Sequence, residues 1–233
     1  MVGTINKLKQ TYKCKYCERE FARESTLDVH VCEQKKRFQH KNDPGNRIGF
    51  QNYLKFYEIT QGSAKTKTFD DFATSAYYKA FVKYGNYCVN SKVINITRYT
   101  EWLLKNNKKI DHWHHDNLYE EFLHEYLFRE NSSDALTRAL QNSIEWAKQT
   151  GNPSEHFLRF GNPNQICHLI QSGQISGWVV FNSDSGHEFL ESLNSEQLAI
   201  VFDYINPDHW QKIFGDYPGD AEYVKEMCRQ AGW

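Results

Sequence analysis

The chain has 233 residues, 39% of them hydrophobic and 15% aromatic, which is enough apolar material for a core of ordinary size. No run is long and apolar enough to cross a bilayer, and the first eleven residues lack a signal-peptide core. We therefore expect an intracellular protein with no membrane contact. The six cysteines indicate no disulfide framework, because three have metal-ligand spacing and three are scattered singly, as in a reducing compartment.

The net charge of −1 conceals a strong asymmetry between the two halves of the chain. Residues 1–109 carry 21 Lys and Arg against 10 Asp and Glu, whereas residues 110–233 carry 7 against 19. Such a division is typical of a polyanion-binding half joined to an acidic half. It predicts nucleic acid as a partner, DNA rather than RNA, and a protein partner for the acidic half.

The first predicted element, residues 12–37, contains closely spaced metal-binding side chains. Cys14 and Cys17 are separated by two residues, a spacing that places both thiolates on one tight turn beside a tetrahedral ion. Twelve residues lie between Cys17 and His30, which suits a returning strand and two helical turns. The segment therefore predicts a bound metal ion.

This segment resembles the C2H2 zinc-finger family over about 25 residues, with the pattern Tyr12-x-Cys14-x2-Cys17-x3-Phe21-x5-Leu27-x2-His30. The resemblance implies a ββα finger that holds Zn²⁺. The family's fourth ligand is a His or Cys three to five residues after the first His, and positions 34–36 offer none. Cys32 and His40 are the alternatives. We favour Cys32, which requires the helix to unwind just past His30, because the loop to His40 is long.

The resemblance also implies which residues contact nucleic acid. In the family, bases are read from the start of the helix, which corresponds here to Arg23, Thr26 and Val29. The cations just beyond the helix are expected to bind phosphates without reading sequence: Lys35, Lys36, Arg37 and Lys41. One finger spans only about three base pairs, so we expect weakly specific contact.

Beyond the finger, the periodicity of apolar residues is helical almost throughout. The predicted organisation is a finger with a basic tail, a polar linker around an Asp-Pro-Gly turn, a basic helical region and an acidic helical region: residues 1–38, 39–48, 49–109 and 110–233. The predicted helices cover residues 50–57, 69–84, 97–106, 117–129, 133–147, 162–170, 195–204, 207–214 and 221–230. The expected fold is mostly α with little β.

Three local signals refine this expectation. Thr68 and Asp71 form a potential capping box for the second helix, and Gly85 stands where that helix is expected to stop. The run 178–181 (WVVF) is the one convincing strand in the body.

Tyrosines interleave with lysines in the basic region, a composition that can bind single strands by stacking bases. Tyr77 and Tyr84 fall on the apolar stripe and are expected in the core. Tyr78 and Tyr87 are the candidates for surface contacts.

A second cluster, residues 111–116 (DHWHHD), contains three histidines and two aspartates. It leaves a metal-dependent nuclease open as an alternative function, with His112, His114 or Asp116 as ligands. A helix start explains the same residues, because Asp116 suits a helix N-terminus.

No enzyme motif is present: neither a GxxxxGK[ST] phosphate loop nor a His-Glu-x-x-His pattern occurs. The three scattered cysteines are expected as inert core residues: Cys88, Cys167 and Cys228. The sequence favours a zinc-dependent nucleic-acid-binding accessory or regulatory protein, and leaves a protein-interaction adaptor with a purely structural finger as a further alternative. In general style the chain resembles finger-bearing proteins of large tailed phages, which would place it in host cytoplasm.

Overall fold

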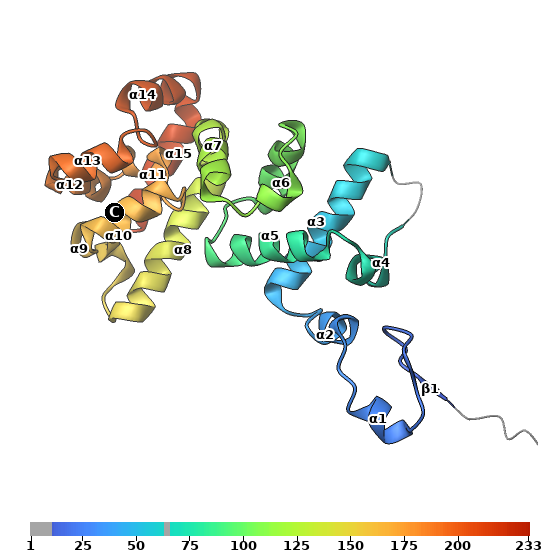
Figure 1. Cartoon of the computed structure of the whole chain (residues 1–233). Helices are drawn as coiled ribbons and strands as arrows, with labels where there is room; N and C mark the ends of the chain where they lie inside the picture. Colours follow the sequence, from blue (N-terminus) through green and yellow to red (C-terminus); the bar gives the residue numbers. More distant parts are fainter. Residues whose placement is uncertain (1–10, 63–65) are drawn as a thin grey trace, which may run out of the picture. The chain divides into compact units, whose positions relative to one another are not determined.

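The computed structural model describes residues 11–62 and 66–233, so the first ten residues of the predicted 1–38 module lie outside it. The described chain is mostly α-helical and carries one small two-stranded sheet, which confirms the predicted fold class. It forms two compact units (Figure 1). Among the described residues, unit 1 comprises 11–62, 66–92 and 104–114, and unit 2 comprises 93–103 and 115–233.

Unit 1 begins with a β-hairpin followed by short and then longer helices. Strands β1 (Tyr12–Lys13) and β2 (Glu20–Phe21) are antiparallel, with Tyr12 opposite Phe21. The helices are α1 (Glu24–Asp28), α2 (Glu33–Gln39), α3 (Pro44–Gln61), α4 (Phe69–Thr74), α5 (Tyr78–Asn90) and the 3₁₀ turn η1 (Ile110–His112). The division between the units falls within α6 (Ile96–Lys105).

The stretch predicted as a linker, residues 39–48, is mostly helical. Helix α2 runs through Gln39 and α3 starts at Pro44, where proline suits a first helical turn. Gly45 and Asn46 are buried, and the Tyr78 hydroxyl donates a hydrogen bond to Asn46 Oδ1 at 2.9 Å. The Asp-Pro-Gly signal therefore marks a helix start.

Helices α3 and α5 pack so closely that no side chain fits between their backbones at the glycine positions (Figure 1). A Cβ atom added to Gly85 would lie 2.0 Å from the carbonyl oxygen of Gly45, and one added to Gly49 would lie 2.7 Å from that of Phe81. The prediction that Gly85 ends its helix was wrong. Gly85 is buried inside α5, where the missing side chain lets α3 approach.

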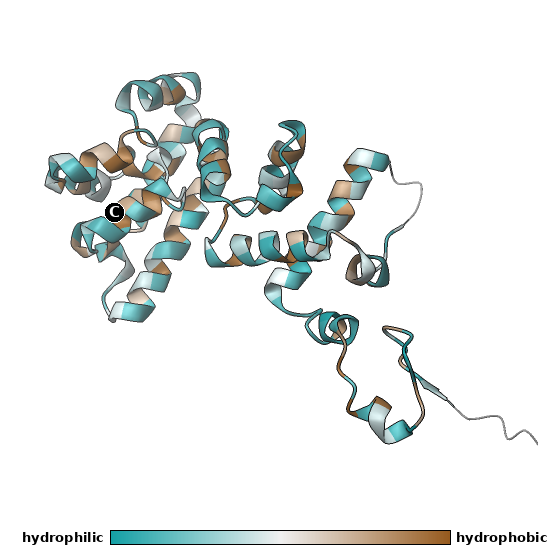
Figure 2. Ribbon diagram, viewed as in Figure 1, coloured by the Kyte–Doolittle hydropathy of each residue, from teal (hydrophilic) through white to brown (hydrophobic). Residues whose placement is uncertain are grey.

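The predicted helix 69–84 is broken at Ser75, where the backbone turns extended between α4 and α5. The Thr68–Asp71 capping box is confirmed at the start of α4. The break also changes which tyrosine faces inward: Tyr78 is 7% exposed and Tyr77 is 45% exposed, the reverse of the expectation. Figure 2 shows hydrophobic and hydrophilic residues alternating along α5.

An aromatic cluster forms the core of unit 1. The Trp113 ring is fully buried, with ring centroids 5.7 Å from Phe81 and 5.3 Å from Tyr84. Tyr53 on α3 packs edge-on against Phe81 at 5.7 Å and tilted against Phe72 at 5.1 Å. Offset and edge-to-face pairs of this kind add to the gain from burial. The predicted core position of Tyr84 is confirmed.

Besides most of α6, unit 2 contains these helices: α7 (Asp116–Tyr126), η2 (Leu127–Arg129), α8 (Ser132–Thr150), η3 (Ser154–His156), α9 (Phe157–Phe160), α10 (Pro163–Gln171), α11 (Gly177–Val180), α12 (Asp184–Ser192), α13 (Ser195–Val201), α14 (Pro207–Asp216) and α15 (Pro218–Gln230). Asparagine side chains accept backbone hydrogen bonds at the N-termini of several: Asn131, Asn162, Asn194 and Asn206. Gly151 ends α8 in the left-handed conformation.

The predicted strand 178–181 is wrong: residues 178–180 belong to helix α11, and Phe181 is its C-cap. Ser176 caps α11 by accepting from the amide of Trp178, and all four α11 residues are buried. A fully buried apolar run has no polar face, so its periodicity does not separate strand from helix. No helix in the described part of the chain is long and apolar enough to cross a membrane.

Candidate metal centre

The β-hairpin positions the first two sulfur atoms. The Cys14 amide donates to the carbonyl of Arg19 and the Glu18 amide donates to the carbonyl of Cys14, both at 2.9 Å. Glu18 adopts a left-handed conformation with φ 62°, which closes the turn after Cys17. The sequence thus folds into a tight turn with both thiols on one side.

The other two donors come from the segment after α1. Helix α1 ends at Asp28, so His30 and Cys32 lie on non-helical backbone. The expected unwinding is therefore present and begins two residues earlier than predicted. Cys32 is the N-cap of α2, and its sulfur accepts the amide of Lys35 at 3.3 Å.

The four side chains predicted as ligands converge in the structure. One donor atom from each of Cys14, Cys17, His30 and Cys32 lies within 4.8 Å of all the others, and Cys17 Sγ is 3.3 Å from His30 Nε2. Bond lengths of ~2.3 Å to sulfur and ~2.0 Å to nitrogen imply donors about 3.5 to 3.8 Å apart around a tetrahedral ion. The group is thus of a size that can hold one metal ion.

His40, the rival fourth ligand, is engaged elsewhere. Its Nδ1 lies 2.9 Å from Asp43 Oδ2 at the end of α2. Cys32 is the residue that the structure brings to the group.

Hydrogen bonds from backbone amides favour the ionised, thiolate form of the cysteines. The backbone amides of Cys17 and Tyr16 lower the pKa of the Cys14 thiol to about 7, against the opposing effect of desolvation. The amide of Arg19 lowers the pKa of Cys17, but desolvation and the neighbouring Cys14 and Cys32 sulfurs outweigh it, so that pKa is raised. Sulfur atoms this close together resist being ionised at the same time. A bound cation removes that repulsion between thiolates.

Aromatic and charged neighbours hold His30 in place. The Phe21 ring centroid lies 4.7 Å from that of His30, and Lys35 Nζ donates to the His30 carbonyl at 3.1 Å. The three predicted core residues of the finger are all half-buried: Tyr12, Phe21 and Leu27.

The predicted nucleic-acid contacts divide into two groups. Arg23, Thr26, Lys36 and Lys41 are exposed. Lys35 bonds to His30, and Arg37 is only 15% exposed in its side chain. The Arg37 guanidinium donates to the Ala73 carbonyl at 2.7 Å and lies 4.4 Å from the Tyr78 ring centroid.

From the sequence, Lys35, Lys36 and Arg37 were placed in a phosphate-binding basic tail, and the helix to which they belong, α2, was missed. The available signal was Phe38, an aromatic residue within an otherwise polar stretch. Its ring lies 5.0 Å from Tyr16 and 5.4 Å from Phe69, measured between centroids, and so connects the hairpin to α4.

The segment 111–116 does not join a comparable group: among residues 11–62 and 66–233, only the Cys14 cluster gathers three or more potential ligands. The scattered cysteines are buried, as expected. Burial raises the pKa of Cys88 and of Cys228 to about 12, which keeps both as unreactive thiols.

Comparisons with protein-family models, curated proteins and solved structures gave no match for this chain. The inference of a metal centre therefore depends on the geometry of the four side chains alone.

Proposed function

We propose that the protein is a zinc-dependent nucleic-acid-binding accessory or regulatory factor that acts on DNA. The observation that carries the proposal is the convergence of three thiols and one imidazole within 4.8 Å. A Cys₃His donor set is typical of a closed structural zinc site, because thiolates are soft ligands that suit Zn²⁺. In this role zinc folds the hairpin and takes no part in a reaction.

Positive charge near the metal centre supports the choice of a polyanion. Exposed cations occur on the hairpin, at the N-cap of α1, on α2, in the turn after it and at the start of α3: Lys15, Arg19, Arg23, Lys36, Lys41 and Arg47. Arg47 was not among the predicted contacts, and it extends the series by one turn of α3. Cations that bind phosphates release counterions, which supplies affinity without sequence readout.

Base readout by α1 has less support. The helix has five residues, or about 7.5 Å at 1.5 Å per residue, and its exposed acids Glu24 and Asp28 would repel phosphates. We infer that the protein binds the backbone of DNA with weak sequence preference, and that the acidic residues 110–233 serve a protein partner.

The test is a salt-titrated binding assay with a fluorescent 20-base-pair DNA duplex, the matching RNA duplex and single strands. The proposal expects DNA binding whose affinity falls steeply as salt rises, and a flatter salt dependence in the variant K36A/K41A/R47A. A zinc-loaded protein that binds none of these at low salt would overturn it.

One observation favours the protein-interaction adaptor as a second candidate. Val29 and Val31, on either side of His30, are 77% and 55% exposed. Two exposed valines beside a metal ligand suit an apolar protein contact better than a phosphate. The same assay separates the two functions, because an adaptor has no salt-dependent affinity for nucleic acid.

A further inference from the structure

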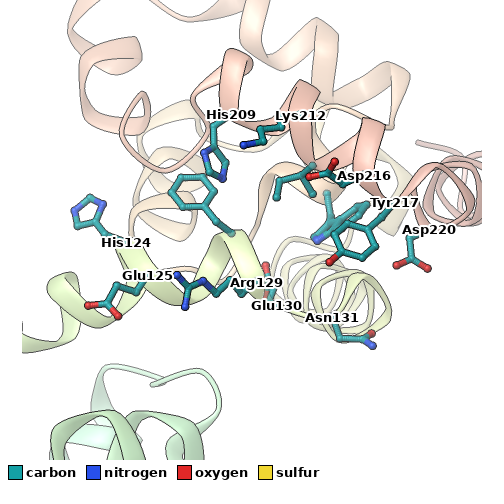
Figure 3. A pocket seen from close by; sticks show the side chains of 13 residues that line it. His124, Glu125, Arg129, Glu130, Asn131, His209, Lys212, Asp216, Tyr217 and Asp220 are labelled. Carbon is teal, nitrogen blue, oxygen red and sulfur yellow. The ribbon is translucent and has the colours of Figure 1, made fainter. Parts of the chain in front are cut away.

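A pocket of about 820 Å³ lies in unit 2, far from the metal centre in sequence. Its walls come from the end of α7, from η2 and from α14 with the start of α15 (Figure 3). Binding sites for small organic groups have volumes of roughly 300–1,000 Å³. The pocket is therefore large enough for such a group.

Aromatic and aliphatic side chains supply the apolar part of the lining. Trp178 is 3% exposed and is fixed by ring contacts with Trp210 at 5.8 Å and Phe214 at 5.4 Å. Phe128 and Ile213 add apolar surface, and Tyr217 at the end of α14 is 56% exposed. Flat electron-rich rings of this kind also attract cations.

A buried carboxylate with unused hydrogen-bonding capacity lies in the lining. The Glu130 side chain is 0% exposed, and its Oε2 accepts from Arg138 Nη2 at 2.7 Å. Its Oε1 is buried and has no donor at hydrogen-bond distance among the described residues, although the Ser176 hydroxyl is near enough to lower the pKa of Glu130. Buried acceptors are normally paired, so an unpaired one beside a cavity indicates a donor that the cavity would hold.

A second unpaired polar atom belongs to a lining residue on α14. His209 Nε2 is buried and has no hydrogen-bond partner in the part of the chain that the structure describes. The His209 ring lies 3.7 Å from that of Phe128. Figure 3 shows His209 and Lys212 on one side of the pocket and Arg129 and Glu130 on the other.

The charged residues around the pocket indicate whether its ligand is positively or negatively charged. Four carboxylates line it, of which Glu130 is paired with Arg138, which leaves Glu125, Asp216 and Asp220 against two cations, Arg129 and Lys212. We propose that this pocket binds an organic cation, a primary ammonium or guanidinium on an apolar stem. The N–H groups donate to Glu130 Oε1, and the stem packs on Trp178 and Phe128. This inference is independent of the metal centre and of DNA binding.

The test uses the full zinc-loaded chain, labelled with ¹⁵N, and follows the indole N–H resonance of Trp178, assigned with Trp178→Phe. The probes share one stem and differ in the head group: n-butylguanidine, n-butylamine, n-butanol and butyrate. We expect saturable shifts with the two cations and at least tenfold weaker binding of the alcohol and the anion. Equal binding of n-butanol, or no saturable shift with either cation, would overturn the proposal.

Variants connect binding to the named carboxylates. Glu130→Gln keeps the shape of the side chain and is expected to weaken n-butylguanidine binding at least tenfold. Because this change leaves Arg138 without its anion, Asp216→Asn at the exposed end of α14 provides a second variant, with an expected loss of about threefold. Asp208→Asn on the same helix lies outside the lining and is expected to leave binding unchanged. Unchanged binding in a folded Glu130→Gln, or in Asp216→Asn, would contradict the assignment.

A further experiment distinguishes whether the cation belongs to a partner protein or to a free amine. A capped Gly-Arg-Gly peptide that binds more tightly than n-butylguanidine indicates a basic side chain of a partner protein. Weaker peptide binding indicates a free amine. In either case, the pocket variants must bind both the peptide and n-butylguanidine more weakly than the natural chain does.

Discussion

Arg37 donates a hydrogen bond from Nη1 to the carbonyl oxygen of Ala73 at 2.7 Å. The bond joins α2, which follows the metal centre, to α4, and the same guanidinium lies over the Tyr78 ring. Arg37 therefore stabilises the fold of unit 1, whereas its neighbour Lys36 is exposed. Two adjacent cations in one basic run thus have different roles.

Replacing each of these cations separates stability from binding. We expect Arg37→Ala to lower the free energy of unfolding by about 1–3 kcal/mol, because it removes a charge-assisted hydrogen bond and a ring contact. Lys36→Ala is expected to change the free energy of unfolding by no more than about 0.5 kcal/mol. It is also expected to reduce, by about 1, the slope of log DNA affinity against log salt concentration. Urea unfolding and the salt titration measure the two effects. Equal stability of both variants would contradict the assigned role of Arg37.

Loss of a metal ligand should have a local effect. We expect Cys14→Ser to unfold residues 12–32, because the hairpin and α1 have few buried side chains besides the ligands. Helices α3 and α5 should persist on their own aromatic core. Hydrogen exchange followed by mass spectrometry checks this, and fast exchange throughout unit 1 would contradict it. Cys88→Ser, a buried thiol outside the cluster, provides the control for loss of a sulfur atom.

The close approach of α3 and α5 predicts a severe effect of one methyl group. A Cβ on Gly85 meets the backbone of Gly45, which cannot rotate away as a side chain can. We expect Gly85→Ala to destabilise unit 1 by about 3 kcal/mol or more. Gly215 on α14 has open space around its Cβ position, so Gly215→Ala should be neutral or stabilising by up to about 1 kcal/mol. Thermal unfolding of the two variants makes the comparison.

The buried pair Glu130–Arg138 predicts a pH dependence of stability. Burial raises the pKa of Glu130 above its usual value, although Arg138 and Ser176 oppose the shift. The folded state therefore binds this proton more tightly than the unfolded state, and stability falls as pH rises from the unfolded pKa through the folded pKa. Glu130→Gln should remove this contribution. Urea unfolding between pH 4 and pH 8, compared for both proteins, checks it, and identical pH profiles would contradict the assignment.

The sequence predicted the features that depend on local chemistry. The grouping of Cys14, Cys17, His30 and Cys32 and the capping box at Thr68 follow from spacing and from side-chain hydrogen bonding, which act within a few residues. Cys32 was chosen over His40 on the same grounds. These predictions need no knowledge of what packs nearby.

The features that depend on distant contacts were missed. Gly85 reads as a helix stop until α3 is present to occupy the space of its side chain. From the sequence Arg37 was predicted to bind phosphate, because its contacts with Ala73 and Tyr78 lie thirty-six or more positions later in the chain. The pocket lining likewise combines residues from 124 to 220, a set that no local pattern unites.

The most direct test of the metal centre is the absorption spectrum of the protein loaded with Co²⁺ in place of zinc, compared between the natural chain and Cys32→Ser. Tetrahedral Co²⁺ with thiolate ligands gives intense visible bands and sulfur-to-metal charge transfer. The account predicts one ion per chain with a three-sulfur tetrahedral spectrum, and a weaker two-sulfur spectrum for Cys32→Ser. Absence of stoichiometric Co²⁺ binding, or a spectrum that Cys32→Ser leaves unchanged and His40→Ala alters, would contradict it.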